Sequence, residues 1–225
     1  MRQTTLVIAL LLAGVWVLGA VGCREESPAM KKANLGRAFM ERGDHERAIR
    51  TLNEAISLDP ELAMSYEILG QTYEAAGRYP EAIQSYRQTV QRDAVRDSAY
   101  TALGCLLLAT EGARPEAKAA LTEAIKLNQA DSRSLACMGA FHLDQRELDK
   151  AVELSAKAAS LNPQNVQAHL NLGFAYSELG RIDEAKASVQ RAIDLARNPQ
   201  VVAQAKMLQE SLDHPRVAGG PGDTH

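Results

Sequence analysis

The chain repeats a short pattern of apolar and small residues at a nearly constant interval. A pair ending in glycine recurs as Leu35-Gly36, Leu69-Gly70, Leu103-Gly104, Met138-Gly139 and Leu172-Gly173. An alanine recurs as Ala48, Ala82, Ala117, Ala151 and Ala185. Both series advance by 34 residues, with one step of 35. Because apolar residues around each pair follow helical spacing and a turn separates the two series, each copy predicts a helix–turn–helix hairpin.

A single helical hairpin cannot bury its own apolar face, so the copies must stack on one another. The third position after each glycine carries an aromatic or a substitute for it: Phe39, Tyr73, Leu107, His142 and Tyr176. With the small-residue pairs and the alanines, this pattern resembles the tetratricopeptide repeat family. The resemblance implies an all-α, right-handed superhelical solenoid of five repeats. The predicted repeats are residues 29–62, 63–96, 97–131, 132–165 and 166–199.

The residues after the fifth repeat predict a cap and a tail. Residues 200–214 are expected to form a helix that covers the exposed end of the solenoid, with Val202, Ala205, Met207 and Leu208 available for burial. Residues 215–225 are rich in glycine and polar residues, so we expect a disordered tail.

The N-terminus has the composition of a secretory signal. A basic residue, Arg2, precedes an apolar stretch over residues 4–22, and small residues lead up to Cys23. This resembles the lipobox of bacterial lipoproteins, with Ala20 where that motif usually has leucine. Residues 1–22 are therefore expected to be a signal peptide, Cys23 a lipidated N-terminus, and residues 23–28 a tether. An uncleaved membrane anchor and a cleaved, unlipidated export product are the alternatives. All three place the repeats outside the cytoplasm; the lipoprotein reading predicts a bacterial envelope protein facing the periplasm or the exterior.

Composition and motifs argue against several other classes of function. The net charge is −3 and no basic stripe is present, so nucleic acid is not an expected partner. The histidines have no metal-type spacing: His45, His142, His169, His214 and His225. No glycine-rich phosphate loop or Gly-x-Ser-x-Gly element occurs. We therefore predict a protein that is not an enzyme, with no catalytic residue, cofactor, metal site or small-molecule substrate.

The two remaining cysteines flank repeat glycines on neighbouring hairpins. In tetratricopeptide proteins such positions face the concave groove, so Cys105 and Cys137 are expected across adjacent first helices. An oxidising compartment permits a disulfide. However, neighbouring helix axes lie about 8–10 Å apart, while a bridge needs Cα atoms within roughly 7 Å. The expectation is two unbridged groove residues. The alternative function is a redox- or metal-responsive envelope protein that uses this pair.

The concave surface of a solenoid is its binding face, so function is expected there. The inward positions of the first two repeats are polar, and those of the last three are more apolar. The predicted groove residues are Asn34, Arg37, Gln71, Thr101, Cys105, Leu108, Ala140, Leu143, Leu170, Asn171 and Phe174. The competing interpretation is that Leu108, Leu143 and Phe174 are core. Of the positions matching the family's carboxylate clamp only Arg37 is basic, so that binding mode is not expected.

These features together predict a non-enzymatic scaffold of the bacterial envelope. Its groove would hold a peptide or helix of a partner protein, with Phe174, Leu170, Leu143 and Leu108 gripping apolar side chains and Asn171 bonding the partner's backbone. The resemblance suggests two settings, pilus or secretion-machine assembly and the recruitment of peptidoglycan enzymes. It does not choose between them, and it names no partner, membrane leaflet or oligomeric state.

Overall fold

The computed structural model describes residues 26–214. The predicted signal peptide, the lipidation at Cys23 and the tail from residue 215 lie outside these residues. The described part contains helices and no strands: α2 (Pro28–Glu41), α3 (His45–Leu58), α4 (Ala63–Ala75), α5 (Tyr79–Arg92), α6 (Asp97–Leu108), α7 (Arg114–Leu127), α8 (Ser132–Asp144), α9 (Leu148–Leu161), α10 (Val166–Glu178), α11 (Ile182–Leu195) and α12 (Pro199–Asp213). Within residues 26–214, no helix has the length and hydropathy needed to cross a membrane.

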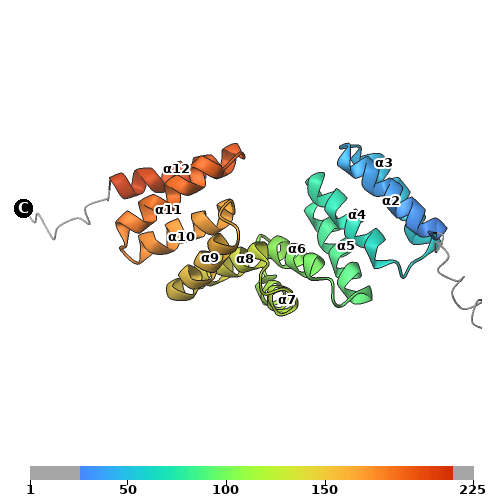
Figure 1. Cartoon of the computed structure of the whole chain (residues 1–225), viewed down its shortest axis with the longest axis horizontal. Helices are drawn as coiled ribbons and strands as arrows, with labels where there is room; N and C mark the ends of the chain where they lie inside the picture. The colour runs from blue at the N-terminus through green and yellow to red at the C-terminus, as the bar shows by residue number, and fades with distance from the viewer. Residues whose placement is uncertain (1–25, 215–225) are drawn as a thin grey trace, which may run out of the picture.

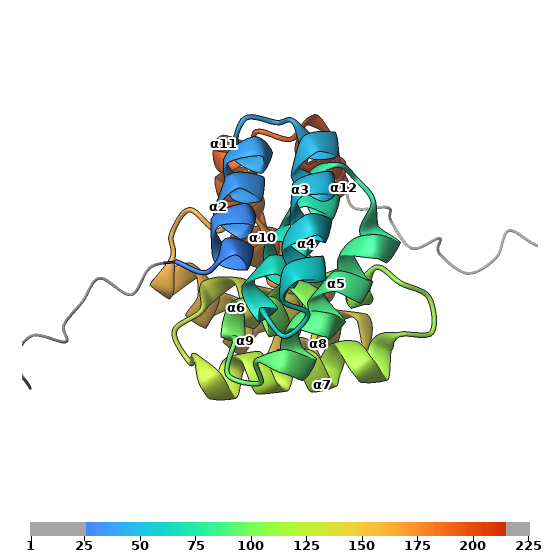
Figure 2. The ribbon, with the colours of Figure 1, turned by 90° about the vertical axis from the view of Figure 1, so that its right-hand side faces the viewer.

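The helices form five antiparallel hairpins and one terminal helix. The pairs α2/α3, α4/α5, α6/α7, α8/α9 and α10/α11 each pack as a hairpin, and every hairpin stacks on the next. Figure 1 shows the hairpins following one another along an arc, with α2 and α3 at one end and α12 at the other. In the perpendicular view α2 and α3 stand in front, α11 and α12 lie behind them, and α7 lies at the bottom (Figure 2). The predicted all-α solenoid of five hairpins and a capping helix is confirmed.

Side-chain caps and prolines explain where seven of the described helices begin. Ser27, Asp44, Asp131, Asn165 and Asn198 each accept a backbone N–H of the first helical turn that follows them. Such side chains satisfy donors that have no partner inside the helix. Prolines occupy the first turn of α2, α5, α7 and α12, where a missing N–H costs no hydrogen bond.

The repeated glycines and alanines allow the two helices of each hairpin to come close. A Cβ built on Gly36 would lie 2.6 Å from Leu52 of the facing helix, and one on Gly173 would lie 2.5 Å from Val189. The second-helix alanines are completely buried: Ala48, Ala82, Ala117, Ala151 and Ala185. The small residues therefore recur because the helix crossing leaves no room for a larger side chain.

Helix α12 covers the last hairpin with a narrow apolar stripe. Ala205, Leu208 and Leu212 are buried against α11 and its neighbours. Met207, in contrast, is 71% exposed, so its expected burial is wrong. The buried residues follow helical spacing of three or four, which turns position 207 away from the hairpin.

Candidate functional site

The structure brings four of the predicted groove residues together around one pocket between the first helices of the last two repeats. Ala140 and Leu143 come from α8, and Asn171 and Phe174 come from α10. We call this hollow the α8–α10 pocket; its volume is about 450 Å³. The other residues that line it are Asp144, Arg146, Gln167, Glu178 and Gln204. Leu143 and Phe174 are each partly exposed, so two apolar side chains reach the pocket surface.

Asn171 is buried in the pocket wall, where its side chain bonds to other residues of the protein. Its side chain is only 2% exposed. The amide Nδ2 donates to the carbonyl oxygen of Ala136 at 2.8 Å, and Oδ1 accepts from Gln167 Nε2 at 2.7 Å. The amide therefore ties α10 to α8. The expectation that Asn171 bonds a partner's backbone is wrong for this amide, because both of its polar atoms already have partners within the chain.

Two further predicted groove residues are buried. Leu170 belongs to the apolar cluster under α11 and α12. Thr101 donates to Asp131 Oδ2 at 2.8 Å. Both stand three residues before the repeat glycine, and this position is buried in every repeat: Ala33, Glu67, Thr101, Ala136 and Leu170. Its side chain is enclosed within the solenoid instead of lining the open groove, so placing Leu170 and Thr101 in the groove is wrong.

The rim of the α8–α10 pocket carries two ion pairs. Arg146 Nη1 lies 3.0 Å from Glu178 Oε2, and Arg114 Nη2 lies 3.1 Å from Asp144 Oδ2. The two negative charges at the rim are thus each matched by an arginine. Gln204 reaches the same rim from α12. The cap helix is therefore part of the site as well as a cover for the core.

Arg146 has an unusual backbone conformation. The other four hairpin turns place a glycine at the corresponding point, each with a positive φ: Gly43, Gly77, Gly112 and Gly180. Arg146 takes the same left-handed conformation, with φ of 58°. For a residue with a Cβ this costs about 1–2 kcal/mol. The turn glycines follow the repeat period, so the arginine at this position is visible in the sequence, although it lies outside the helical positions that predict the groove.

A second hollow lies between repeats two, three and four. Its volume is about 520 Å³, and its lining residues are Gln71, Glu74, Ala75, Tyr79, Tyr86, Ser98, Ala102 and Arg133. Glu74 Oε1 accepts from Arg133 Nη2 at 3.0 Å, and Glu74 Oε2 accepts from the Tyr86 hydroxyl at 3.0 Å. Burial raises the pKa of Tyr86 well above its usual value, and the nearby Glu74 carboxylate raises it further. Of the predicted polar groove residues, only Gln71 lies here.

The remaining two polar predictions lie elsewhere. Asn34 and Arg37 are exposed on α2 and line neither hollow. Asn34 Nδ2 lies 3.4 Å from both carboxylate oxygens of Glu26.

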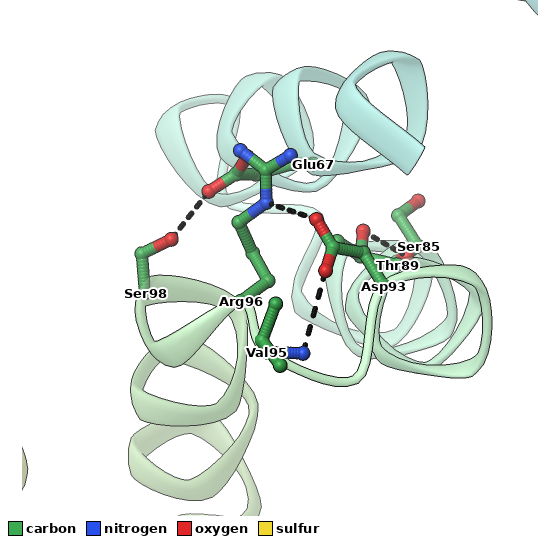
Figure 3. Close-up of polar contacts among 7 residues, drawn as sticks. All are labelled: Glu67, Ser85, Thr89, Asp93, Val95, Arg96 and Ser98. Atoms are coloured by element: carbon green, nitrogen blue, oxygen red, sulfur yellow. Dashed lines mark hydrogen bonds and ion pairs between the residues drawn. The ribbon is translucent and has the colours of Figure 1, made fainter. Parts of the chain in front are cut away.

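Repeats two and three are joined by a polar network, shown in Figure 3. The buried carboxylate of Glu67 accepts from Ser98 Oγ at 2.6 Å and pairs with Arg96 Nη1 at 3.2 Å. Arg96 Nε also donates to Asp93 Oδ2 at 2.9 Å. A buried charge needs such partners. Glu67 therefore links α4 to α6 instead of offering its charge to a ligand.

Cys105 and Cys137 form a disulfide between α6 and α8, with their Cα atoms 5.5 Å apart. The expectation of two unbridged cysteines is wrong, because the relevant distance joins facing Cα atoms and not helix axes. Each Cα lies about 2.3 Å from its own axis, so facing atoms come several ångströms closer than the axes do. Both cysteines, like Leu108, pack against the apolar cluster of Leu121, Met138 and Phe141.

Two of the histidines have partners within the chain. His142 Nδ1 lies 3.0 Å from Glu147 Oε2, and His169 Nε2 lies 3.0 Å from the carbonyl oxygen of Pro163. Among residues 26–214 no group of three or more histidine, cysteine, aspartate or glutamate side chains is arranged to hold a metal ion. The described residues therefore present hollows and apolar contacts that suit binding.

The stacked hairpins and the concave hollows define a helical repeat protein, and comparison with known proteins identifies its family. Two tetratricopeptide repeat models match residues 34–97 and 142–212, together more than half of the chain. A further model, described as anaphase-promoting complex subunit 5, matches residues 89–147. The chain belongs to the tetratricopeptide repeat family, whose members act as protein-interaction scaffolds and use their concave surfaces for binding.

The curated relatives are longer than this chain. It is 26% identical over 157 residues to TPR repeat-containing protein YpiA of Bacillus subtilis, which covers 70% of this chain and 37% of YpiA. It is 27% identical over 189 residues to Protein O-mannosyl-transferase TMTC1 of Homo sapiens, covering 79% of this chain and 20% of TMTC1. The chain thus spans less than two fifths of either relative. The tetratricopeptide fold itself is generally non-enzymatic, although TMTC1 is named a transferase.

Solved structures show the same fold. MamA is 29% identical with a TM-score of 0.62, covering 71% of this chain and 93% of MamA. YrrB, described as a TPR protein with an unusual peptide-binding site, is 23% identical with a TM-score of 0.63, covering 80% of this chain and 92% of YrrB. Pseudomonas aeruginosa pilF is 19% identical with a TM-score of 0.66, covering 82% of this chain and 88% of pilF. At their levels of identity, YrrB and pilF support the fold alone.

Proposed function

We propose that this protein is a non-enzymatic scaffold that holds a segment of a partner protein in the α8–α10 pocket. The observation that carries the proposal is the pairing of two partly exposed apolar side chains, Leu143 and Phe174, inside a hollow of about 450 Å³ with a polar rim. Such a site suits an apolar anchor side chain, with the rim amide of Gln204 available to the backbone around it. A helix or an extended peptide can present that anchor.

We further propose that the protein works in a bacterial envelope, tethered by a lipid on Cys23. The basic start, the apolar stretch over residues 4–22 and the small residues before Cys23 support this location. The disulfide supports it independently, because such bonds persist in oxidising compartments and are rare in the cytosol. Pilus or secretion-machine assembly and the recruitment of peptidoglycan enzymes are the two settings that the proposal includes.

Affinity capture tests the proposed pocket. Full-length protein and a Leu143→Arg, Phe174→Arg variant are used to capture partners from detergent-solubilised envelope, and mass spectrometry identifies them. A Leu58→Arg, Leu161→Arg variant is the matched control, since both leucines are exposed and lie on second helices. Circular dichroism verifies that each variant keeps its helicity.

We expect a partner that the wild type and the control capture and the pocket variant does not. Equal capture by all three proteins would move binding away from the α8–α10 pocket. Loss of helicity in the pocket variant alone would show that Leu143 and Phe174 are core residues, and would contradict the proposal.

The disulfide favours a second candidate function, a redox-responsive envelope protein. The bond joins α6 to α8, and α8 forms one wall of the pocket, so its reduction could change the groove. Both sulfurs are engaged in the bond, which leaves neither thiolate as a ligand for the metal-responsive form of this idea. The test is a thiol titration with and without reductant, followed by partner capture in each state. Free thiols at Cys105 and Cys137 without reductant, or equal capture in both states, would exclude redox control.

A further inference from the structure

Arg146 occupies the left-handed turn position that the other four hairpins give to glycine. A residue in this conformation lowers the stability of the fold unless its side chain contributes something elsewhere. The turn itself gains nothing from an arginine, because its backbone bonds use only main-chain atoms: the N–H of Arg146 donates to Leu143 and that of Glu147 to His142. The reason for the arginine must therefore lie in its side chain.

The contact that the side chain makes within the protein does not offset this cost. Arg146 contributes one nitrogen, Nη1, to the ion pair with Glu178, and its side chain remains 73% exposed. Exposed pairs of this kind add little to stability. A guanidinium has five N–H donors, so most of its hydrogen-bonding capacity is directed away from Glu178. That capacity lies at the rim of the α8–α10 pocket.

We propose that Arg146 makes the α8–α10 pocket selective for a partner segment in which an acidic residue stands beside the apolar anchor. This inference rests on the proposed function of the pocket and adds the chemistry of the ligand. With the anchor against Leu143 and Phe174, a neighbouring carboxylate can accept two parallel bonds from the Arg146 fork. Arg114 also gives one nitrogen to a carboxylate, that of Asp144, but it does not line the pocket. Arg146 is thus the arginine whose remaining donors lie at the pocket.

The test compares synthetic peptides that differ at one position. Short peptides with a central leucine or phenylalanine carry glutamate, glutamine or lysine beside it, and fluorescence anisotropy measures their binding to the full-length protein in detergent. The protein variants are Arg146→Gly, Arg146→Lys, Arg114→Ala as the matched control, and Phe174→Arg. Thermal unfolding is recorded for each.

The wild type should bind the glutamate peptides about fivefold more tightly than their glutamine counterparts. Arg146→Gly should remove this difference in affinity. It should also raise the melting temperature by roughly 2–4 °C, because glycine adopts a positive φ without the steric cost of a Cβ. Arg146→Lys should keep part of the preference without the gain in stability. Arg114→Ala should keep the preference for glutamate.

Three results would overturn the inference. The wild type could show no preference for glutamate; it could prefer lysine; or the preference could survive in Arg146→Gly, whatever its melting temperature, as for a merely structural arginine. In each case, binding that depends on Phe174 would leave the proposed function intact. Peptide binding that is absent, or indifferent to Phe174→Arg, would contradict both.

Discussion

At the scale of single residues, Ser155 departs from the pattern of its repeat position. The corresponding residues facing the first-helix glycines are Leu52, Tyr86, Leu121 and Val189, and all four are large. Ser155 is completely buried, and its hydroxyl has no hydrogen-bond partner. An unsatisfied buried hydroxyl lowers stability because it has lost its bonds to water.

Replacing this serine should therefore stabilise the protein. We predict that Ser155→Ala raises the free energy of unfolding by about 1 kcal/mol. Ser134→Ala should lower it by about 1 kcal/mol, because Ser134 is equally buried but donates its hydroxyl to the carbonyl oxygen of Asp131 at 3.0 Å. Urea unfolding followed by circular dichroism measures both. Equal destabilisation by the two substitutions would mean that the Ser155 hydroxyl has a partner after all.

Tyr86 should make stability fall at high pH. Its buried hydroxyl donates to Glu74, and burial first, then the carboxylate, raise its pKa above the ordinary value near 10. Below that value tyrosine is neutral in both the folded and the unfolded chain, so its ionisation does not change the free energy of unfolding with pH there. Above about pH 10 it ionises readily only in the unfolded chain, and the folded state loses stability as pH rises.

The measurement is the ultraviolet absorbance of tyrosinate in the wild type and in Tyr86→Phe across the alkaline range. We expect the signal that belongs to Tyr86, the difference between the two proteins, to appear only together with the loss of helical circular dichroism. Its appearance near pH 10 in a folded protein would contradict the buried hydrogen bond to Glu74.

At the scale of elements, the rotation of α12 about its axis decides which of its side chains stabilise the solenoid. Leu208 and Leu212 are buried, while Met207 is exposed. Leu208→Ala should cost about 2–5 kcal/mol of unfolding free energy, as expected for a buried leucine. Met207→Ala should change it by less than about 0.5 kcal/mol. Urea unfolding of the two variants measures this, and a larger loss from Met207→Ala would contradict the observed rotation.

The elements were predictable because each signal for them is local in sequence. Apolar residues at helical spacing, glycines in the turns and prolines in first turns indicate the five hairpins without reference to distant residues. Side chains between helices were harder to place. Thr101 bonds the residue that caps α8, and Leu170 packs under α11 and α12, which the pattern of a single repeat does not reveal. Comparing the five repeats does not mark the position as buried, because it holds the polar Glu67 and Thr101 as well as apolar residues.

At the scale of the whole molecule, the candidate site depends on features that the repeat pattern does not contain. The period alone points to Ala140, Leu143 and Phe174 on the inner face. Arg146 comes from a turn. Gln204 comes from the cap helix α12, whose position depends on how it packs on α10 and α11. Typical axis spacing predicts no disulfide, whereas the facing Cα atoms of Cys105 and Cys137 lie 5.5 Å apart, and this distance depends on how the two helices cross.

Site-specific photo-crosslinking tests the central claim, that the α8–α10 pocket holds a partner segment. A photoreactive amino acid is placed at Gln204 on the pocket rim or at Lys206, which is also exposed on α12 but does not line the pocket. Illumination is done in cells of the source organism. We predict an adduct with a partner from position 204, little or none from position 206, and its loss when Phe174→Arg is added. Equal adducts from both positions, or none from position 204, would contradict the account.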